Sequence, residues 1–160
     1  NAMETLLVHE DAAAEFLPQM LTEYFAAGVT IIGCGKTQAF DKRIRAATEA
    51  DWATEYGDLR LSAKIVSGLE EALAHIAKYG TKHSECIVTS DYNHARTFQQ
   101  RVDAAAVYVN ASTRFTDGFE FGFGAEIGIS TQKLHARGPM ALPELTSSKY
   151  LISGDGQIRG

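Results

Sequence analysis

Two periods of apolar residues alternate along this chain. Helical spacing, with apolar residues three or four positions apart, runs over 13–27, where Gly28 predicts the stop and Pro18 should fall in the first turn or two. The same spacing returns over 69–79, after a Ser67 to Glu70 capping box and before Gly80. These two stretches are predicted to be amphipathic helices, and the second has the clearer boundaries.

Short β-branched runs that are typical of strands separate the helical stretches. Strands are predicted over 5–9, 29–32, 59–65, 86–89 and 104–109, with a third helix over 92–101. The run 59–65 alternates apolar and polar residues, which predicts a strand with one buried face. This alternation of strand and helix, with right-handed crossovers, predicts an α/β fold in which helices flank a parallel sheet.

Beyond Asn110 the periodicity stops. A glycine-rich and aromatic stretch without a clear element fills 111–139, and a stretch of that length inside a compact domain is usually functional. A short helix and a last strand over 150–153 are predicted after it.

The composition of the chain argues against several classes of function. The chain has 160 residues, 45% of them apolar, which suits one buried core. Its net charge of -5 is spread along the sequence, so no basic face for nucleic acid or membrane lipid is predicted. Two cysteines without an apolar leader fit a reduced cytoplasmic protein, and five scattered histidines have no metal-binding spacing. The expectation is therefore a protein without metal, nucleic-acid or membrane partners.

The segment 110–118 holds the densest candidate chemistry. It follows a predicted strand, at the carboxyl end where open α/β sheets bind their ligands. The Arg114 guanidinium suits a carboxylate or phosphate, and neighbouring hydroxyls and amides suit shorter hydrogen bonds. An ordinary loop that satisfies its own backbone is the alternative. The candidate ligand-binding residues here are Asn110, Ser112, Thr113, Arg114 and Phe115.

Three further segments invite weaker hypotheses. Close glycines over 121–128 let backbone amides approach an anion, although their spacing is not a dinucleotide fingerprint. The Gly33 to Lys36 turn lacks the spacing of a phosphate loop, and no histidine near Cys34 in sequence supports a nucleophilic thiol. Glu55 is able to accept two ribose hydroxyls, but a short capped helix with exposed acids explains 52–58 equally well.

Taken together, these residues resemble the gamma-glutamyl phosphate reductase family of the aldehyde dehydrogenase superfamily. The resemblance runs from end to end, over 4–9, 54–59, 75–83, 107–118, 124–133, 135–139 and 157–159, and the run from Asn110 to Phe115 is highly specific. It implies the Rossmann-like catalytic domain of that superfamily over 1–148 and an oligomerisation strand within 149–160. It also implies that a dinucleotide-binding domain precedes this part.

The resemblance assigns chemistry to individual residues. In the family a nucleophilic cysteine directly precedes a segment like the one beginning at Asn1, so the chain as given is expected to lack it and to be inactive. The implied reaction is NADPH-dependent reduction of L-glutamyl 5-phosphate to glutamate 5-semialdehyde in proline biosynthesis, through a cysteine thioester. Glu55 resembles the superfamily's ribose-contacting acid, and the turn at Gly124 and Ala125 resembles the anchor for the substrate α-carboxylate.

Other readings remain open from the sequence. The reductase half of a bifunctional delta-1-pyrroline-5-carboxylate synthase shares these motifs. A phosphate-independent aldehyde dehydrogenase fits the 110–115 loop poorly, and a non-catalytic α/β binding or oligomerisation module needs no nucleophile. Homo-oligomerisation, and glutamate 5-kinase as a pathway partner, are expected from the resemblance alone.

Overall fold

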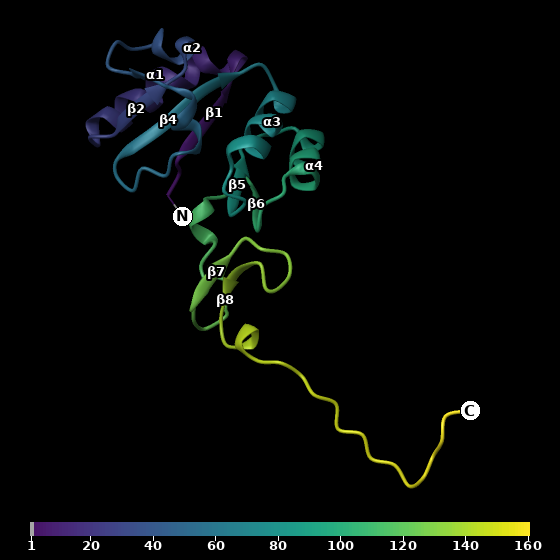
Figure 1. The fold of residues 1–160 in the computed structure, drawn as a ribbon. Helices are drawn as coiled ribbons and strands as arrows, with labels where there is room; N and C mark the ends of the chain where they lie inside the picture. Colours follow the sequence, from purple (N-terminus) through teal and green to yellow (C-terminus); the bar gives the residue numbers. More distant parts are fainter. Residues whose placement is uncertain (1) are drawn as a thin grey trace.

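A computed structural model describes residues 2–160 and shows a mixed α/β body with an arm and a tail below it (Figure 1). The first sheet is parallel, in the order β1-β4-β2-β3. Its register pairs Thr5 with Ser62 and Thr30 with Arg60. Its strands are β1 (Thr5–His9), β2 (Thr30–Gly33), β3 (Arg45–Ala46) and β4 (Arg60–Val66). The predicted parallel α/β fold is confirmed.

The first helix begins earlier than the pattern predicts. Helix α1 spans Glu10–Ala26, because the His9 side chain accepts a hydrogen bond from the Asp11 backbone N–H at 3.2 Å and caps its start. Pro18 therefore lies in the helix interior, and its predicted place in the first turns is wrong. Gly28 ends the segment as predicted, with a φ of 78°.

Strand β4 is buried on both faces, which corrects the predicted single buried face. It lies between β1 and β2, so it has a strand on each side. Its polar Ser62 is fully buried because its hydroxyl donates to the Asp51 carbonyl at 3.1 Å. The polar Ser62 that alternates with apolar residues in this strand is therefore hydrogen-bonded inside the protein and does not face solvent. The core around this sheet comprises Val8, Ala13, Leu17, Met20, Leu21, Ile31, Ile44, Leu61, Ala63 and Ile65.

A second parallel sheet pairs β5 (Ser84–Ile87) with β6 (Ala106–Val109). Helices α3 (Leu69–Tyr79) and α4 (Tyr92–Arg101) contact each other, and α4 also contacts β6. Their small core contains Leu73, Phe98 and Val102. Within residues 2–160 the parallel strands thus form two sheets, where the order of elements predicted a single one.

The start of α3 corrects the predicted capping box. The Ser67 backbone N–H and hydroxyl both donate to the Glu71 carboxylate, each at 2.9 Å, whereas Glu70 pairs with Arg101 on α4. Gly68 is the N-cap and has no side chain to cap the helix, so the contact between Ser67 and Glu71 replaces the predicted capping box. The remaining short helices are α2 (Gly35–Gln38) and the 3-10 helices η1 (Glu49–Ala53), η2 (Thr113–Phe115) and η3 (Pro143–Leu145).

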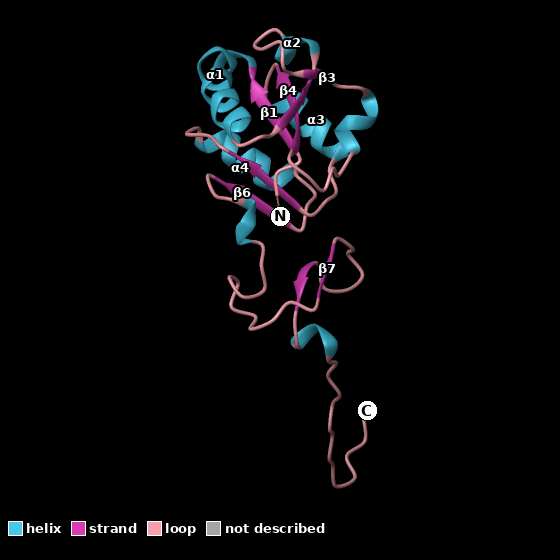
Figure 2. Ribbon diagram, turned by 90° about the vertical axis from the view of Figure 1, so that its left-hand side faces the viewer, coloured by secondary structure: helices cyan, strands magenta, loops and turns pink. Residues whose placement is uncertain are grey.

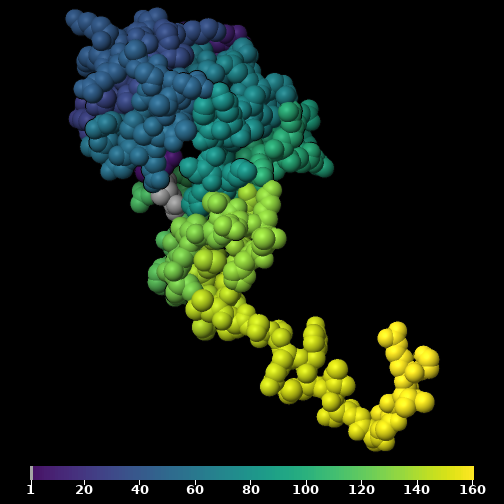
Figure 3. All heavy atoms as spheres, viewed as in Figure 1, coloured from purple at the N-terminus to yellow at the C-terminus, as the bar shows by residue number. Residues whose placement is uncertain are grey.

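The stretch predicted to lack structure contains a hairpin. Strands β7 (Gly128–Ser130) and β8 (Gly138–Met140) pair antiparallel and form an arm below the α/β body (Figure 2). From residue 146 onward no helix or strand is present, so the strand predicted over 150–153 does not form in the isolated chain. The tail extends away from the body (Figure 3). Among the described residues, no helix has the length and apolar character needed to cross a membrane.

Candidate functional site

The candidate loop begins where β5 and β6 both end. The Asn110 side chain joins these two ends, since its Oδ1 accepts from the Thr89 backbone N–H and its Nδ2 donates to the Thr89 carbonyl, each at 2.9 Å. Asn110 has a φ of 54°, a left-handed conformation that asparagine tolerates better than most residues. Its amide is therefore engaged in fixing the loop.

The next residues form the short helix η2 and present a free cation. Ser112 is its N-cap and accepts from the Arg114 backbone N–H at 3.2 Å. Arg114 is exposed, and its guanidinium makes no ion pair with any residue between 2 and 160. Phe115 beside it is 52% exposed. A cation, a capping hydroxyl and an aromatic ring thus face solvent together.

Thr116 ties the loop to the second sheet. It is fully buried, and its hydroxyl is hydrogen-bonded to the Tyr108 hydroxyl and accepts from Ser84 Oγ at 3.2 Å. Ser84 Oγ is also 3.1 Å from His83 Nδ1, and burial lowers the pKa of His83. Cys86 is half-buried, and its thiol donates to the Ala111 carbonyl at 3.1 Å.

Gly118 brings the two predicted substrate segments into contact. Its backbone N–H donates to the Glu126 carboxylate at 2.9 Å. A Cβ built on it would lie 2.2 Å from the Ala125 carbonyl oxygen, so only glycine allows this approach. Gly124 has a φ of 74°, which shapes the adjoining turn. The structure therefore assembles 110–118 with the turn at Gly124 and Ala125.

Glu55 lies on a separate loop, between η1 and β4. It is exposed and follows a 3-10 helix whose capping box joins Thr48 to Asp51. Together with burial, its charge raises the pKa of Glu4. The short capped helix that the sequence offered as an alternative is present, and the exposed carboxylate beside it stays available to a ligand.

The remaining segment that the sequence singled out, the Gly33 to Lys36 turn, has structural partners. Lys36 pairs with Glu10 at 3.0 Å, and Cys34 Sγ lies 3.2 Å from the Thr37 hydroxyl. Burial acts to raise the pKa of Cys34, but hydrogen bonds from Thr37 and neighbouring backbone groups outweigh it and lower that pKa. Within residues 2–160 no group of three His, Cys, Asp or Glu side chains is placed to hold a metal ion.

Known proteins match this chain along its whole length. Gamma-glutamyl phosphate reductase of Moorella thermoacetica is 65% identical over 99% of the chain, and that of Clostridium perfringens is 64% identical over the same share. The crystal structure of gamma-glutamyl phosphate reductase from Thermotoga maritima superimposes with a TM-score of 0.94, at 54% identity over 98% of the chain. The chain is a relative of the gamma-glutamyl phosphate reductases. The family resemblance seen in the sequence is thereby confirmed.

These reductases are longer than this chain. The chain spans 38% of the length of the Moorella and Clostridium relatives and 38% of the Thermotoga structure. The reductase structure from Saccharomyces cerevisiae is more distant, with a TM-score of 0.56 and 36% identity over 76% of the chain. No family model matches the chain. The nucleophilic cysteine was expected directly before Asn1, and Asn1 itself lies outside the residues that the structure describes.

Residues that the sequence analysis missed support the loop. Thr116, Ser84 and Tyr108 come from three different elements, and their contacts join residues up to 32 positions apart. A local pattern carries no signal for such a contact. Gly118 is the last residue of the 110–118 segment. A glycine at this position was the one sign in the sequence that another part of the backbone approaches closely.

Proposed function

We propose that this chain is the C-terminal part of the catalytic domain of a gamma-glutamyl phosphate reductase. The whole enzyme would convert L-glutamyl 5-phosphate to L-glutamate 5-semialdehyde and phosphate in the cytoplasm, within proline biosynthesis. The free Arg114 guanidinium on η2, where β5 and β6 end, carries the proposal, because an anionic substrate requires such a cation and the chain resembles the reductases through this loop.

The loop divides into supporting and binding groups. Asn110 supports it, since its amide is already bonded to Thr89. Arg114 is placed to bind a carboxylate or phosphate oxygen, with the Ser112 and Thr113 hydroxyls as further hydrogen-bond partners. The Gly124 and Ala125 turn would hold the α-carboxylate through backbone N–H groups, and Phe115 would shield the bound substrate from water.

The chemistry of an acyl phosphate suits this arrangement. In the proposed reaction a cysteine thiolate attacks the acyl carbon, the bond to phosphate breaks, and a thioester results. Arg114 would stabilise the negative charge of the departing phosphate or fix the α-carboxylate, depending on which end of the substrate it holds. NADPH would supply the hydride that converts the thioester to the aldehyde.

The exposed carboxylate of Glu55 fits a contact with the ribose of a nicotinamide cofactor. Two ribose hydroxyls need acceptors, and this carboxylate makes no hydrogen bond to any other described residue. Preference for NADPH over NADH follows from the resemblance and not from these residues. Glutamate 5-kinase, which makes an acyl phosphate of this class, is the proposed pathway partner, and a bifunctional synthase would contain both activities.

Oxidation of glutamate 5-semialdehyde by NADP, with and without phosphate, tests this function in the whole protein. We expect activity that requires phosphate, and a loss of at least about 100-fold in kcat/KM for Arg114→Ala. Arg96→Ala is the matched control, because Arg96 is also exposed but bonds to Tyr92 on α4. Activity without phosphate would instead indicate an ordinary aldehyde dehydrogenase. Equal losses of kcat/KM in both variants would show that Arg114 has no specific role in binding the substrate.

A further inference from the structure

His75 is a buried histidine without a hydrogen-bond partner. It lies on α3 with 6% of its surface exposed, and both of its ring nitrogens are buried and unbonded within the described residues. A buried polar group without a partner costs free energy, so such a residue requires an explanation. Phenylalanine would fill the same space at lower cost.

Two aromatic rings enclose this imidazole. The Trp52 ring meets it edge to face, with centroids 5.4 Å apart, and the Tyr79 ring lies 4.6 Å away in a tilted arrangement. Trp52 belongs to η1, whereas His75 and Tyr79 belong to α3. Contacts of this kind are worth about 0.5–1.5 kcal/mol beyond burial, so the stack holds η1 against α3.

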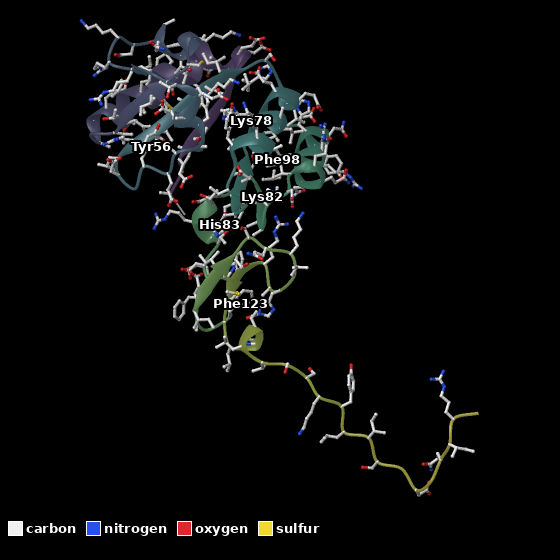
Figure 4. All side chains as sticks on the ribbon, in the orientation of Figure 1. Tyr56, Lys78, Lys82, His83, Phe98 and Phe123 are labelled. Carbon is white, nitrogen blue, oxygen red and sulfur yellow. The ribbon has the colours of Figure 1, made fainter. Side chains whose placement is uncertain are left out.

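Glu49 adds an ionic contact between the same two elements. Its carboxylate accepts from Lys78 Nζ at 2.6 Å and from the Tyr79 hydroxyl. The other end of the segment is held by Tyr56, whose hydroxyl donates to Asp51 at 2.8 Å and lies 3.1 Å from Ser62 Oγ. Figure 4 labels Lys78 and Tyr56, which lie apart from one another in this view. Glu55 lies in the sequence between Trp52 and Tyr56, so contacts hold the segment on both sides of it.

We propose that His75 is a positioning residue for the cofactor: its neutral ring, packed between Trp52 and Tyr79, holds the segment that presents Glu55. This inference rests on the proposed contact between Glu55 and the cofactor ribose. A protonated imidazolium would have no hydrogen-bond acceptor in this position and would loosen the stack. The positioning thus depends on pH as well as on packing.

The charges around His75 set the pH range. Burial and then Lys64 on β4 lower the pKa of His75 to about 4, and Lys78 acts in the same direction. Glu71 on α3 and Glu49 on η1 oppose the shift. Because the pKa lies below the usual value of 6.5, the folded state prefers the neutral ring. The contribution of the neutral ring to stability is complete above the usual pKa of 6.5 and is lost as the pH falls toward about 4.

The first experiment uses the only tryptophan of the chain, Trp52, as a reporter. We expect its fluorescence to change with one protonation step centred near pH 4 as the pH falls from about 7 to about 3, and this step to vanish in His75→Phe. His94→Phe, on the exposed face of α4, should keep the step. An unchanged titration in His75→Phe would overturn the proposal.

The second experiment separates positioning from general stability. In the whole enzyme, Lys78→Met and His75→Ala should each raise the KM for NADPH, by about fivefold or more, with little change in the KM for glutamyl phosphate. His75→Phe should restore the NADPH KM and extend activity to lower pH. If both KM values rise together, or if Phe does not rescue Ala, His75 is merely structural.

A third variant distinguishes this inference from the role of Glu55 on which it rests. Glu55→Gln should raise the KM for NADPH on its own. If it does not, while Trp52 still reports the His75 titration, the cofactor contact is wrong and the stack is only a structural support. If Glu55→Gln raises that KM but His75→Ala does not, the cofactor contact stands and His75 has no positioning role.

Discussion

The Asn110 side chain forms a pair of hydrogen bonds with the backbone of Thr89, each 2.9 Å long, across the ends of β6 and β5. The two residues are 21 positions apart, yet the amide matches a peptide group in both donor and acceptor. The pair therefore continues the sheet pairing by one step beyond the strands. It sets where the loop that carries Arg114 leaves the sheet.

Replacing Asn110 tests this relationship. Asn110→Ala loses both hydrogen bonds and leaves a residue that tolerates a φ of 54° less well than asparagine does, so we expect a loss of about 2 kcal/mol in the free energy of unfolding. Asn110→Gly loses the same bonds but tolerates the backbone, and should lose only about half as much. Urea denaturation measures both, with Asn93→Ala on α4 as the exposed control. Equal losses for Ala and Gly would show that the backbone conformation contributes nothing.

Gly118 offers a second test, because it determines how closely the two proposed substrate segments approach. A Cβ at this position would meet the Ala125 carbonyl, which belongs to the backbone and has little freedom to move. We expect Gly118→Ala to destabilise the chain by about 1–3 kcal/mol and to raise the KM for glutamyl phosphate in the whole enzyme.

Gly35→Ala is the matched control for this substitution. No atom lies within 4 Å of a Cβ built on Gly35, and its backbone does not require glycine. It should leave both the stability and the KM nearly unchanged. A substrate KM that is equally unaffected by Gly118→Ala would separate the turn at Gly124 and Ala125 from the substrate site.

Local signals predicted the elements well where those signals were complete. Helix α4 begins at Tyr92 and ends at Arg101 as predicted, because Asp91 caps its start and the apolar spacing ends with it. Strand β1 likewise matches its predicted bounds. The start of α1 was wrong because histidine is a rare cap, so His9 gave no recognisable signal. The hairpin of β7 and β8 was missed because its strands have only three residues each.

The candidate site was predictable in its chemistry but not in its support. Arg114 and Ser112 stood out because cations and hydroxyls near a strand end suit an anionic ligand. The contacts of Thr116 with Tyr108 and Ser84 depend on how η2 folds back on β5 and β6. His75 gave no signal of a special role, since a sequence shows neither the Trp52 ring beside it nor its burial.

Glu85 predicts a pH dependence of opposite sign to that of His75. It borders a cavity of about 160 Å³ between α3 and the start of β5, and burial, followed by the charge of Glu4, raises its pKa to about 7. The folded state therefore prefers the protonated acid. Its stabilising contribution is complete below the usual value of 4.5 and is lost as the pH rises through about 7.

Glu85→Gln removes this titration while keeping the shape of the side chain. We expect it to raise the free energy of unfolding above about pH 8 by on the order of 2 kcal/mol, and to change it little below about pH 5. Urea denaturation at both pH values measures the difference. Glu15→Gln, on the exposed face of α1, should have no such effect. A stabilisation that is equal at both pH values would mean that Glu85 is already neutral or already solvated.

The tail gives the last prediction, which concerns association between chains. Its apolar residues have no cover in the isolated chain, with Tyr150 90%, Leu151 84% and Ile152 91% exposed. Extended backbone with unpaired N–H and C=O groups pairs readily with a free strand edge, so we propose that this segment adds to a sheet of a neighbouring subunit. Light scattering should then give a mass above that of the monomer as the concentration rises.

Truncation after Ser148 provides the control for that measurement. The shortened chain keeps the α/β body and the hairpin, and it should scatter as a monomer at the concentrations where the full chain associates. Leu151→Lys should act in the same direction, because a charge on this face opposes its burial between subunits. A full chain that stays strictly monomeric would remove the tail from the interface, and association that survives truncation would place the contact on the body or the hairpin instead.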